Sequence, residues 1–193
     1  MRSVLVSGLT AVLFAACCSS SFAQTKPGIE YRVLATNKTS TMEKEINGAA
    51  EAGFRFQSAM GGETAIGGNE VVVVVSRTEG SKGRYAYKLL ATSRTSTMEK
   101  ELQVAADAGF EYRTQTVFNS AFGGDEVVCI LERDKDAGEG RGQYRLVATT
   151  KTSTLEKELV DAGAAGYQVL GMTVAKTALG GKELVAIMRR DRR

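Results

Sequence analysis

The chain repeats one unit of about fifty residues three times, which is the feature that most limits its fold. The string TSTMEKE runs from Thr39 to Glu45 and again from Thr95 to Glu101, and TSTLEKE follows from Thr152 to Glu158. Three further residue types recur 56 and then 57 residues apart: Tyr31, Tyr87 and Tyr144; Gly53, Gly109 and Gly166; Glu70, Glu126 and Glu183. The units contain no internal insertions and the glycine-rich connectors between them vary, so we interpret the chain as tandem copies of one supersecondary unit.

The first half of each unit is predicted to be a strand followed by a helix. YRVLAT, YKLLAT and YRLVAT alternate apolar and polar residues, as strands do. After TST, the apolar residues Met42, Ile46 and Ala49 are spaced as one face of a helix. Gly53 and its counterparts stand where a helix commonly ends on a left-handed residue.

The second half of each unit is predicted to be a hairpin. Strand-like runs lead to the pairs Gly67-Gly68, Gly123-Gly124 and Gly180-Gly181, which suit a tight turn. EVVVVVSR, EVVCILER and ELVAIMRR follow, and their centres are apolar on both faces, as in a central strand. We therefore predict an α+β fold of three βαββ repeats, each a split β-α-β sheet of order 1-3-2 with one helix. The repeats span residues 30–78, 85–134 and 143–191.

A single helix covers only one face of each sheet, so the units should dock. A small core without disulfide or metal rarely yields more than about 3–5 kcal/mol. The repeats would then bury their second sheet faces or join sheet edges, and we expect a pseudo-threefold body. Three separately folded beads are the alternative.

The end of each unit resembles a family of small bacterial βαββ domains of unknown function. In that family the helix is typically followed by Gly-Trp, and here Phe or Tyr replaces the Trp. The residues that carry the resemblance are Ala52-Gly53-Phe54, Ala108-Gly109-Phe110 and Ala165-Gly166-Tyr167, with Arg77, Arg133 and Arg190 closing the last strands. The resemblance implies the fold and no known chemistry.

Residues 1–23 are predicted to be a signal peptide, which places the protein in the periplasm or outside the cell. Arg2 gives the positive start, Val4 to Ala16 the apolar region and Ser21-Phe22-Ala23 the cleavage site. The apolar run is shorter than the roughly 20 residues of a spanning helix, so we expect no transmembrane segment in the mature chain. The alternative is a lipid anchor on Cys17, because Phe14-Ala15-Ala16-Cys17 resembles a lipoprotein box.

Composition argues against several classes of function. The chain has no histidine and no tryptophan, which removes Ser-His-Asp and Cys-His catalysis and the commonest zinc ligand. Its formal charge of +3 falls to +2 without Arg2, so we expect no nucleic-acid binding. Four arginines near the C-terminus form either a solvated end or a contact for an anionic surface: Arg189, Arg190, Arg192 and Arg193. Cys129 lies in an apolar strand and is expected to be a buried small hydrophobe.

Two sets of repeated polar residues are candidate sites. The first has the S-x-x-E spacing of a helix capping box: Ser40 and Glu43, Ser96 and Glu99, Ser153 and Glu156. Binding of an anion at the helix start by Thr39, Ser40 and Lys44 is its functional alternative. The second set, Glu70, Glu126 and Glu183, could meet around a cation if the units close on an axis, or could pair with basic residues at sheet edges.

The sequence favours an exported, non-catalytic repeat protein of the bacterial cell envelope, with no cofactor and no metal. It would bind or scaffold through the hairpin loops MGGETAI, TVFNSAF and TVAKTAL, which are the least repeated stretches. The partner would be a protein or another envelope ligand. One alternative is a hydrolase or transferase that uses carboxylates at an interface between repeats. The other is a carrier for a small ligand or lipid.

Overall fold

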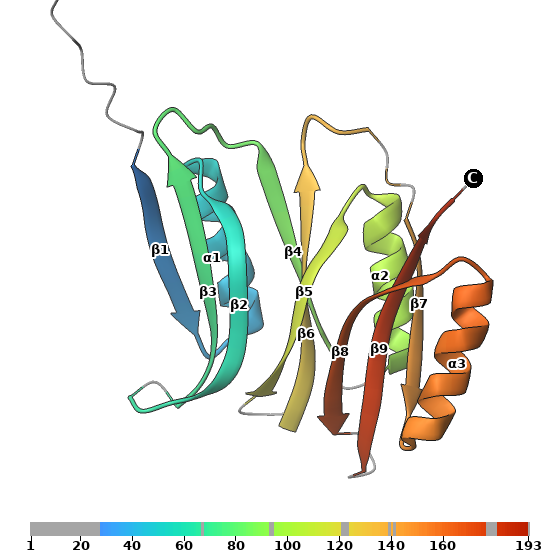
Figure 1. Ribbon diagram of the computed structural model, residues 1–193. Helices are drawn as coiled ribbons and strands as arrows, with labels where there is room; N and C mark the ends of the chain where they lie inside the picture. The colour runs from blue at the N-terminus through green and yellow to red at the C-terminus, as the bar shows by residue number, and fades with distance from the viewer. Residues whose placement is uncertain are drawn as a thin grey trace, which may run out of the picture.

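The computed structural model describes residues 28–66, 68–92, 95–120, 124–138, 140, 142–176 and 181–192. The predicted signal peptide 1–23, with the alternative anchor Cys17, lies outside these residues. So does the first glycine of each double-glycine turn. Figure 1 shows the three repeated units side by side along the chain.

Each unit is a strand, a helix and a hairpin, in that order. The bounds are β1 Ile29–Thr36, α1 Thr39–Glu51, β2 Arg55–Thr64 and β3 Gly68–Thr78; β4 Tyr85–Thr92, α2 Thr95–Asp107, β5 Glu111–Ser120 and β6 Gly124–Asp134; β7 Gly142–Thr149, α3 Thr152–Ala164, β8 Gln168–Lys176 and β9 Lys182–Asp191. All strand pairs are antiparallel, and the sheet orders are β1-β3-β2, β4-β6-β5 and β7-β9-β8. The predicted α+β fold with the third strand at the centre is confirmed.

Each helix ends on the glycine that the sequence indicated. Gly53, Gly109 and Gly166 have φ values of 86°, 84° and 85°. In the first unit the Gly53 N–H donates to the Ala50 carbonyl at 2.9 Å, and the Phe54 N–H donates to the Ala49 carbonyl at 3.0 Å. This pair of bonds is the Schellman motif, and the other two units repeat it.

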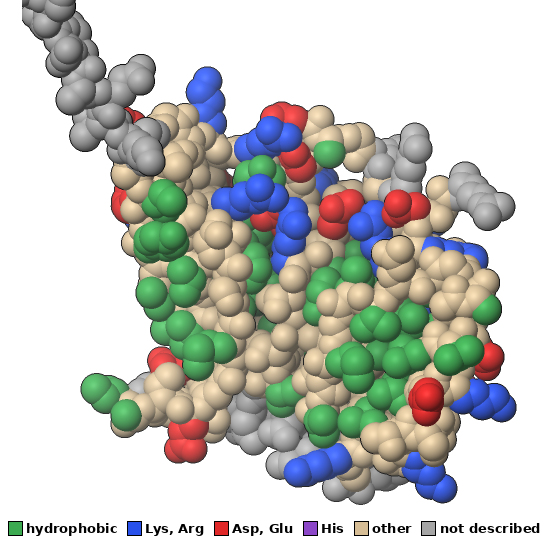
Figure 2. Space-filling model, in the orientation of Figure 1, with side chains coloured by type: hydrophobic (Ala, Val, Ile, Leu, Met, Phe, Trp, Pro, Cys, Tyr) green, Lys and Arg blue, Asp and Glu red, His purple; other side chains and the backbone are tan. Residues whose placement is uncertain are grey.

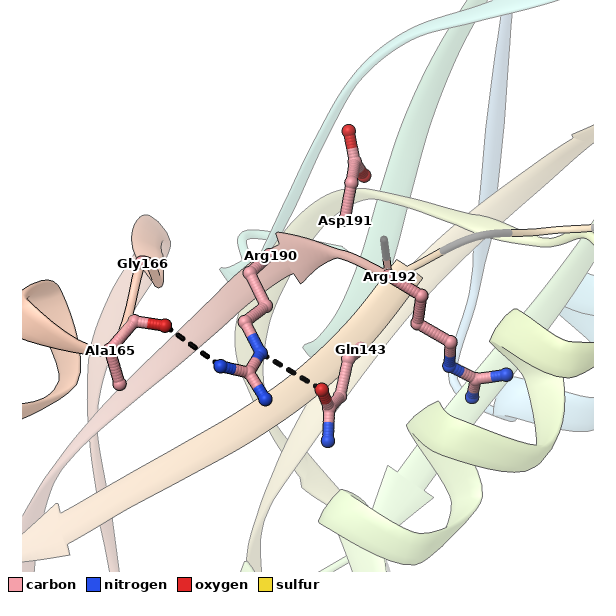
Figure 3. A pocket seen from close by; sticks show the side chains of 6 residues that line it. All are labelled: Gln143, Ala165, Gly166, Arg190, Asp191 and Arg192. Carbon is pink, nitrogen blue, oxygen red and sulfur yellow. Dashed lines mark hydrogen bonds between the residues drawn. The ribbon is translucent and has the colours of Figure 1, made fainter.

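The arginine that closes each unit caps the C-terminus of the helix. Arg77 lies 4.5 Å above the Phe54 ring, and its Nη1 donates to the Ala52 carbonyl at 2.9 Å. In the third unit Arg190 lies 4.7 Å above the Tyr167 ring and donates to the Ala165 carbonyl at 2.8 Å (Figure 3). A cation there satisfies a free carbonyl and opposes the negative end of the helix dipole.

The units stack in series, as sheet and helix in alternation across Figure 1. Met42 and Ile46 of α1 pack on Val73 of their own sheet and also on Val128 and Ile130 of the next sheet. α2 sits in the same way between the second sheet and the third. Both faces of the middle sheet are therefore buried, as the docking prediction required.

The expectation of a pseudo-threefold body is wrong. The main contacts between units join α1 to β4, β2 to β5, α2 to β7 and β5 to β8, so they link neighbours along the chain. Closure would need the first unit to pack on the third, and the main contacts within the described ranges include no such pair. α1 lies between the first and second sheets, and α2 lies between the second and third. The three units are therefore arranged in a line.

Candidate functional site

The helices α1 and α2 each bind the free edge of the first strand in the following unit. Asn47 of α1 accepts the Tyr87 N–H with Oδ1 and donates to the Tyr87 carbonyl with Nδ2, both at 2.9 Å. Glu43 accepts the Leu89 N–H at 2.7 Å. An exposed strand edge is a template for aggregation, and these side chains cover it.

The second junction repeats this arrangement with different residues. Gln103 of α2 accepts the Tyr144 N–H at 3.1 Å, and Glu99 accepts the Leu146 N–H at 2.9 Å. Gln103 also donates to the Gly142 carbonyl at 3.3 Å. The repeated glutamate is thus a link between units.

The predicted capping box is not formed in α1 or α3. The N-cap positions belong to Lys38 and Lys151, neither helix has a side-chain capping bond, and neither first turn contains an acidic residue. Ser40 and Ser153 are each the second residue of a helix, whereas a capping box needs the serine at the N-cap itself. The side chain of Ser96 lies outside the described residues.

The glutamates of that motif have different partners in the three units. Glu43 and Glu99 are taken up by backbone N–H groups of the following unit. Glu156 is exposed on α3. We attribute the failed prediction to the position of the helix start: the N-cap lies two residues before the serine, and this holds in α3 as well, where no following unit takes up the glutamate.

Among the described residues, Glu132 is the charged residue that is buried, and it lies at the junction of the first two units. Its side chain is 1% exposed. Arg55 of β2 bonds it at 2.9 Å, and Arg113 of β5 forms a second ion pair with it. The Tyr87 hydroxyl donates to Glu132 at 2.7 Å and accepts the Phe56 N–H at 2.8 Å. The three partners lie on β4, β2 and β5, so each bond to Glu132 links β6 to another strand.

The electrostatics of this cluster keep Glu132 ionised. Burial alone would raise the pKa of its carboxyl, but hydrogen bonds from Arg55 and Tyr87 and the charge of Arg113 outweigh burial and lower the pKa. Burial raises the pKa of the Tyr87 hydroxyl, and the hydrogen bond to Glu132 raises the pKa of Arg55. A carboxylate held in this way is a poor proton donor near neutral pH.

A cleft of about 400 Å³ opens beside this cluster, between the units. Its lining includes four carboxylates, which would suit the hydrolase alternative if any were free. Each has an arginine partner: Glu132 with Arg55 and Arg113, Glu111 and Asp191 with Arg189, and Asp134 with Arg84. The four carboxylates that line the cleft are consequently all engaged in ion pairs.

The two junctions carry the same ion pair with its charges exchanged. Arg55 pairs with Glu132 at the first junction, and Glu111 pairs with Arg189 at 3.3 Å at the second. Arg55 and Glu111 occupy the same position in successive units, at the start of β2 and β5. Glu132 and Arg189 likewise face the tyrosines of β4 and β7 in the sheet register.

The second predicted set, Glu70, Glu126 and Glu183, lies one to a sheet. Glu70 is paired across the hairpin with Gly62 of β2, and its carboxylate accepts the Thr64 hydroxyl at 2.6 Å. Glu126 and Glu183 hold the same register in β6 and β9. In the part of the chain that the structure describes, no three histidine, cysteine, aspartate or glutamate side chains are grouped to hold a metal ion.

The basic C-terminal residues are tied into the fold. Arg190 donates to the Gln143 side chain at 2.9 Å as well as to the helix end (Figure 3). Arg189 pairs with Glu111, and Arg192 bonds Asp107 of α2 at 2.5 Å. Arg193 lies outside the described residues. Three of the four positive charges thus have anionic or carbonyl partners.

Cys129 is buried in β6, as predicted. Its Sγ lies 3.6 Å from the Met98 sulfur, and burial raises the pKa of the thiol to about 12. Such a thiol is unreactive in the folded state, because the nucleophile is the thiolate.

Sequence reasoning did not identify Asn47, Arg55, Tyr87 or Glu132 as junction residues. Two signals pointed to Tyr87 and Glu132, and none pointed to Asn47 or Arg55. The tyrosine is aligned in all three copies, and the residues across the sheet from it are Ser76, Glu132 and Arg189, which differ in charge within an otherwise uniform repeat.

No protein-family model, curated protein or solved structure matches the chain. The resemblance to bacterial βαββ domains accordingly stays a prediction. Among the helices within the described ranges, none is both long and apolar enough to span a membrane.

Proposed function

We propose that the protein is an exported, non-catalytic repeat protein of the bacterial cell envelope that binds or scaffolds through its hairpin loops. The observation that carries the proposal is the use of the polar groups at the junctions. The buried carboxylate and the tyrosine hydroxyl beside it already have partners within the fold. The carboxylates that line the inter-unit cleft have arginine partners too.

The arrangement of the hairpins supports a binding role. β2, β5 and β8 run toward the same end of the molecule in Figure 1, so the three connections to β3, β6 and β9 leave from one side. Ile66, in the first of these connections, is fully exposed. A row of loops on a rigid scaffold is a common form of recognition surface.

Binding can be tested by co-sedimentation with isolated bacterial cell-wall and membrane fractions. Ile66→Ser should weaken retention without changing the thermal unfolding midpoint. Val104→Ser on α2 is the matched control, because that valine is also exposed and lies away from the hairpins. Equal retention of both variants and of the unaltered protein would contradict binding through the loops.

Export can be tested by fractionating cells that make the full chain and sequencing the N-terminus of the product. Release into the periplasm or medium with Gln24 as the first residue is expected. An acylated Cys17 would show the lipid-anchored form. Retention in the cytoplasm with Met1 intact would overturn the export part of the proposal.

A further inference from the structure

The first strand of the first unit lacks the cover that the other two units have. Tyr31 is 63% exposed, whereas its counterparts Tyr87 and Tyr144 are 3% and 5% exposed. Val33 of the same strand is also 63% exposed. In the described residues no helix side chain bonds the outer edge of β1. We name this surface, formed by β1 and the outer faces of β3 and β2, the front face.

The last unit has the opposite surface without a partner. On α3, Glu156 is exposed, and Val160 is 65% exposed at the position that Asn47 and Gln103 hold in the other helices. β8 adds four exposed apolar side chains: Val169, Leu170, Met172 and Val174. Figure 2 shows hydrophobic atoms gathered over this part of the molecule, and others along the β1 side. We name the surface of α3 and β8 the rear face.

We propose that the rear face of one molecule docks on the front face of a second copy of this chain, head to tail. The fold already makes this contact twice, when α1 and β2 meet the second unit and when α2 and β5 meet the third. A third step of the same kind joins α3 and β8 to β1 and β2 of another molecule. The inference does not depend on export or on binding by the hairpins.

The residues at the two ends fit the contacts seen inside. Glu156 would accept the Val33 N–H, as Glu43 accepts the Leu89 N–H. The Tyr31 hydroxyl would accept the Val169 N–H, as the Tyr87 hydroxyl accepts the Phe56 N–H. In the docked state both end faces would bury side chains that are otherwise exposed, which favours association.

Charge at the ends is also compatible with docking. At the position of the internal ion pairs the rear face has Gln168 and the front face has Ser76, and both are neutral. A buried charge without a partner would oppose association, and docking of these two faces would leave none at this position. Val160 replaces the amide that clamps the strand edge inside, so the contact between copies is more apolar and weaker than the internal ones.

Such an interface joins unlike faces, so it leads to chains or rings of molecules rather than to a symmetric pair. Sedimentation velocity of the purified protein from roughly 1 to 500 µM covers the affinity range of transient interfaces. The mean mass should rise with concentration. A single-chain mass at every concentration would overturn the proposal.

Two variants separate the faces. Val33→Arg blocks the front face and Val160→Arg blocks the rear face, and each should stay monomeric. Val104→Arg is the matched control, 63% exposed on α2 and on neither end face, and should associate like the unaltered protein. Thermal unfolding of each variant checks its fold, and Tyr31→Lys replaces Val33→Arg if that variant does not fold.

Mixing the two blocked variants gives the decisive measurement. Val33→Arg keeps a working rear face and Val160→Arg keeps a working front face, so an equimolar mixture should form species of two chains and none larger. Self-association of either variant alone would overturn the head-to-tail arrangement. So would a mixture that stays monomeric.

Discussion

Glu132 shows at the residue scale how a single buried charge holds two units together. Glu132→Gln keeps the size of the side chain and removes its charge. It should lower the free energy of unfolding by about 1.5–3 kcal/mol, the usual worth of hydrogen bonds to a charged group. Urea denaturation measures this loss.

Glu111→Gln is the control for that change. Its ion pair with Arg189 occupies the equivalent place at the second junction, but the Glu111 side chain is half exposed. The loss should stay below about 1 kcal/mol, as for other exposed pairs. Equal losses at the two sites would contradict the special role of burial at Glu132.

The acid dependence of stability should also change in Glu132→Gln. The pKa of Glu132 is lower in the folded protein than the value of about 4.3 for an unfolded chain. Its contribution is therefore present above pH 4.3 and is lost as the pH falls through the folded pKa. Unfolding free energies measured at successive pH values should bring the variant and the unaltered protein together in acid. A constant difference would show that ionisation of Glu132 is not the cause.

Substitution of the repeated serine and of the repeated glutamate should differ in their effect on the free energy of unfolding. Ser40→Ala should change the free energy of unfolding by less than about 0.5 kcal/mol, because Ser40 makes no capping bond. Glu43→Ala should lower it by about 1–2 kcal/mol, because the Leu89 N–H loses its acceptor. Chemical denaturation of both variants tests the pair. A larger loss from Ser40→Ala would restore the capping interpretation.

At the scale of elements, the connector between the second and third units packs against a helix end, which its composition did not indicate. Glycine-rich connectors indicate flexible linkers, yet a Cβ on Gly140 would clash with the Ala106 carbonyl at the end of α2. A Cβ on Gly138 would meet nothing within 4 Å. The connector therefore needs glycine where it crosses the helix end.

Gly140→Ala should thus lower the free energy of unfolding by about 1–3 kcal/mol, the usual cost of overpacking. Gly138→Ala, two residues earlier, should have almost no effect. Thermal unfolding of both variants measures the difference. Similar midpoints would show that the connector can move away from α2.

The elements themselves could be predicted because their signals are local. The apolar runs through Val73 and Ile130 indicated central strands, and Gly53 indicated a helix end, and all three were confirmed. The helix starts could not be fixed in the same way. Thr39, Ser40 and Thr41 can each cap a helix, yet the N-cap is Lys38, and α3 begins at the equivalent residue without a following unit.

The junctions were beyond prediction because they join residues far apart in the sequence. Arg55 and Glu132 are separated by 77 positions. Apolar sheet faces predicted that the units dock, but these faces fit a closed body and a line equally well. The line was decided by the helix that fills each gap and binds the next strand edge.

At the scale of the whole molecule, one unit should not fold alone. A fragment of residues 28–78 leaves Met42 and Ile46 without Val128 and Ile130, which complete their core. We expect it to lack a cooperative unfolding transition by calorimetry, whereas a fragment of residues 28–134 should have one. A cooperative, monomeric 28–78 fragment would show that docking is not required.

The exchanged ion pairs bear on how near-identical segments avoid misassembly while the chain folds. Swapped contacts between similar neighbours are a characteristic error of tandem proteins. If the first unit skipped the second and met the third, Arg55 would face Arg189, and two positive charges would repel. If second units from two molecules met, Glu111 would face Glu132. Opposite polarity at the two junctions thus disfavours both of these mispairings while the chain folds.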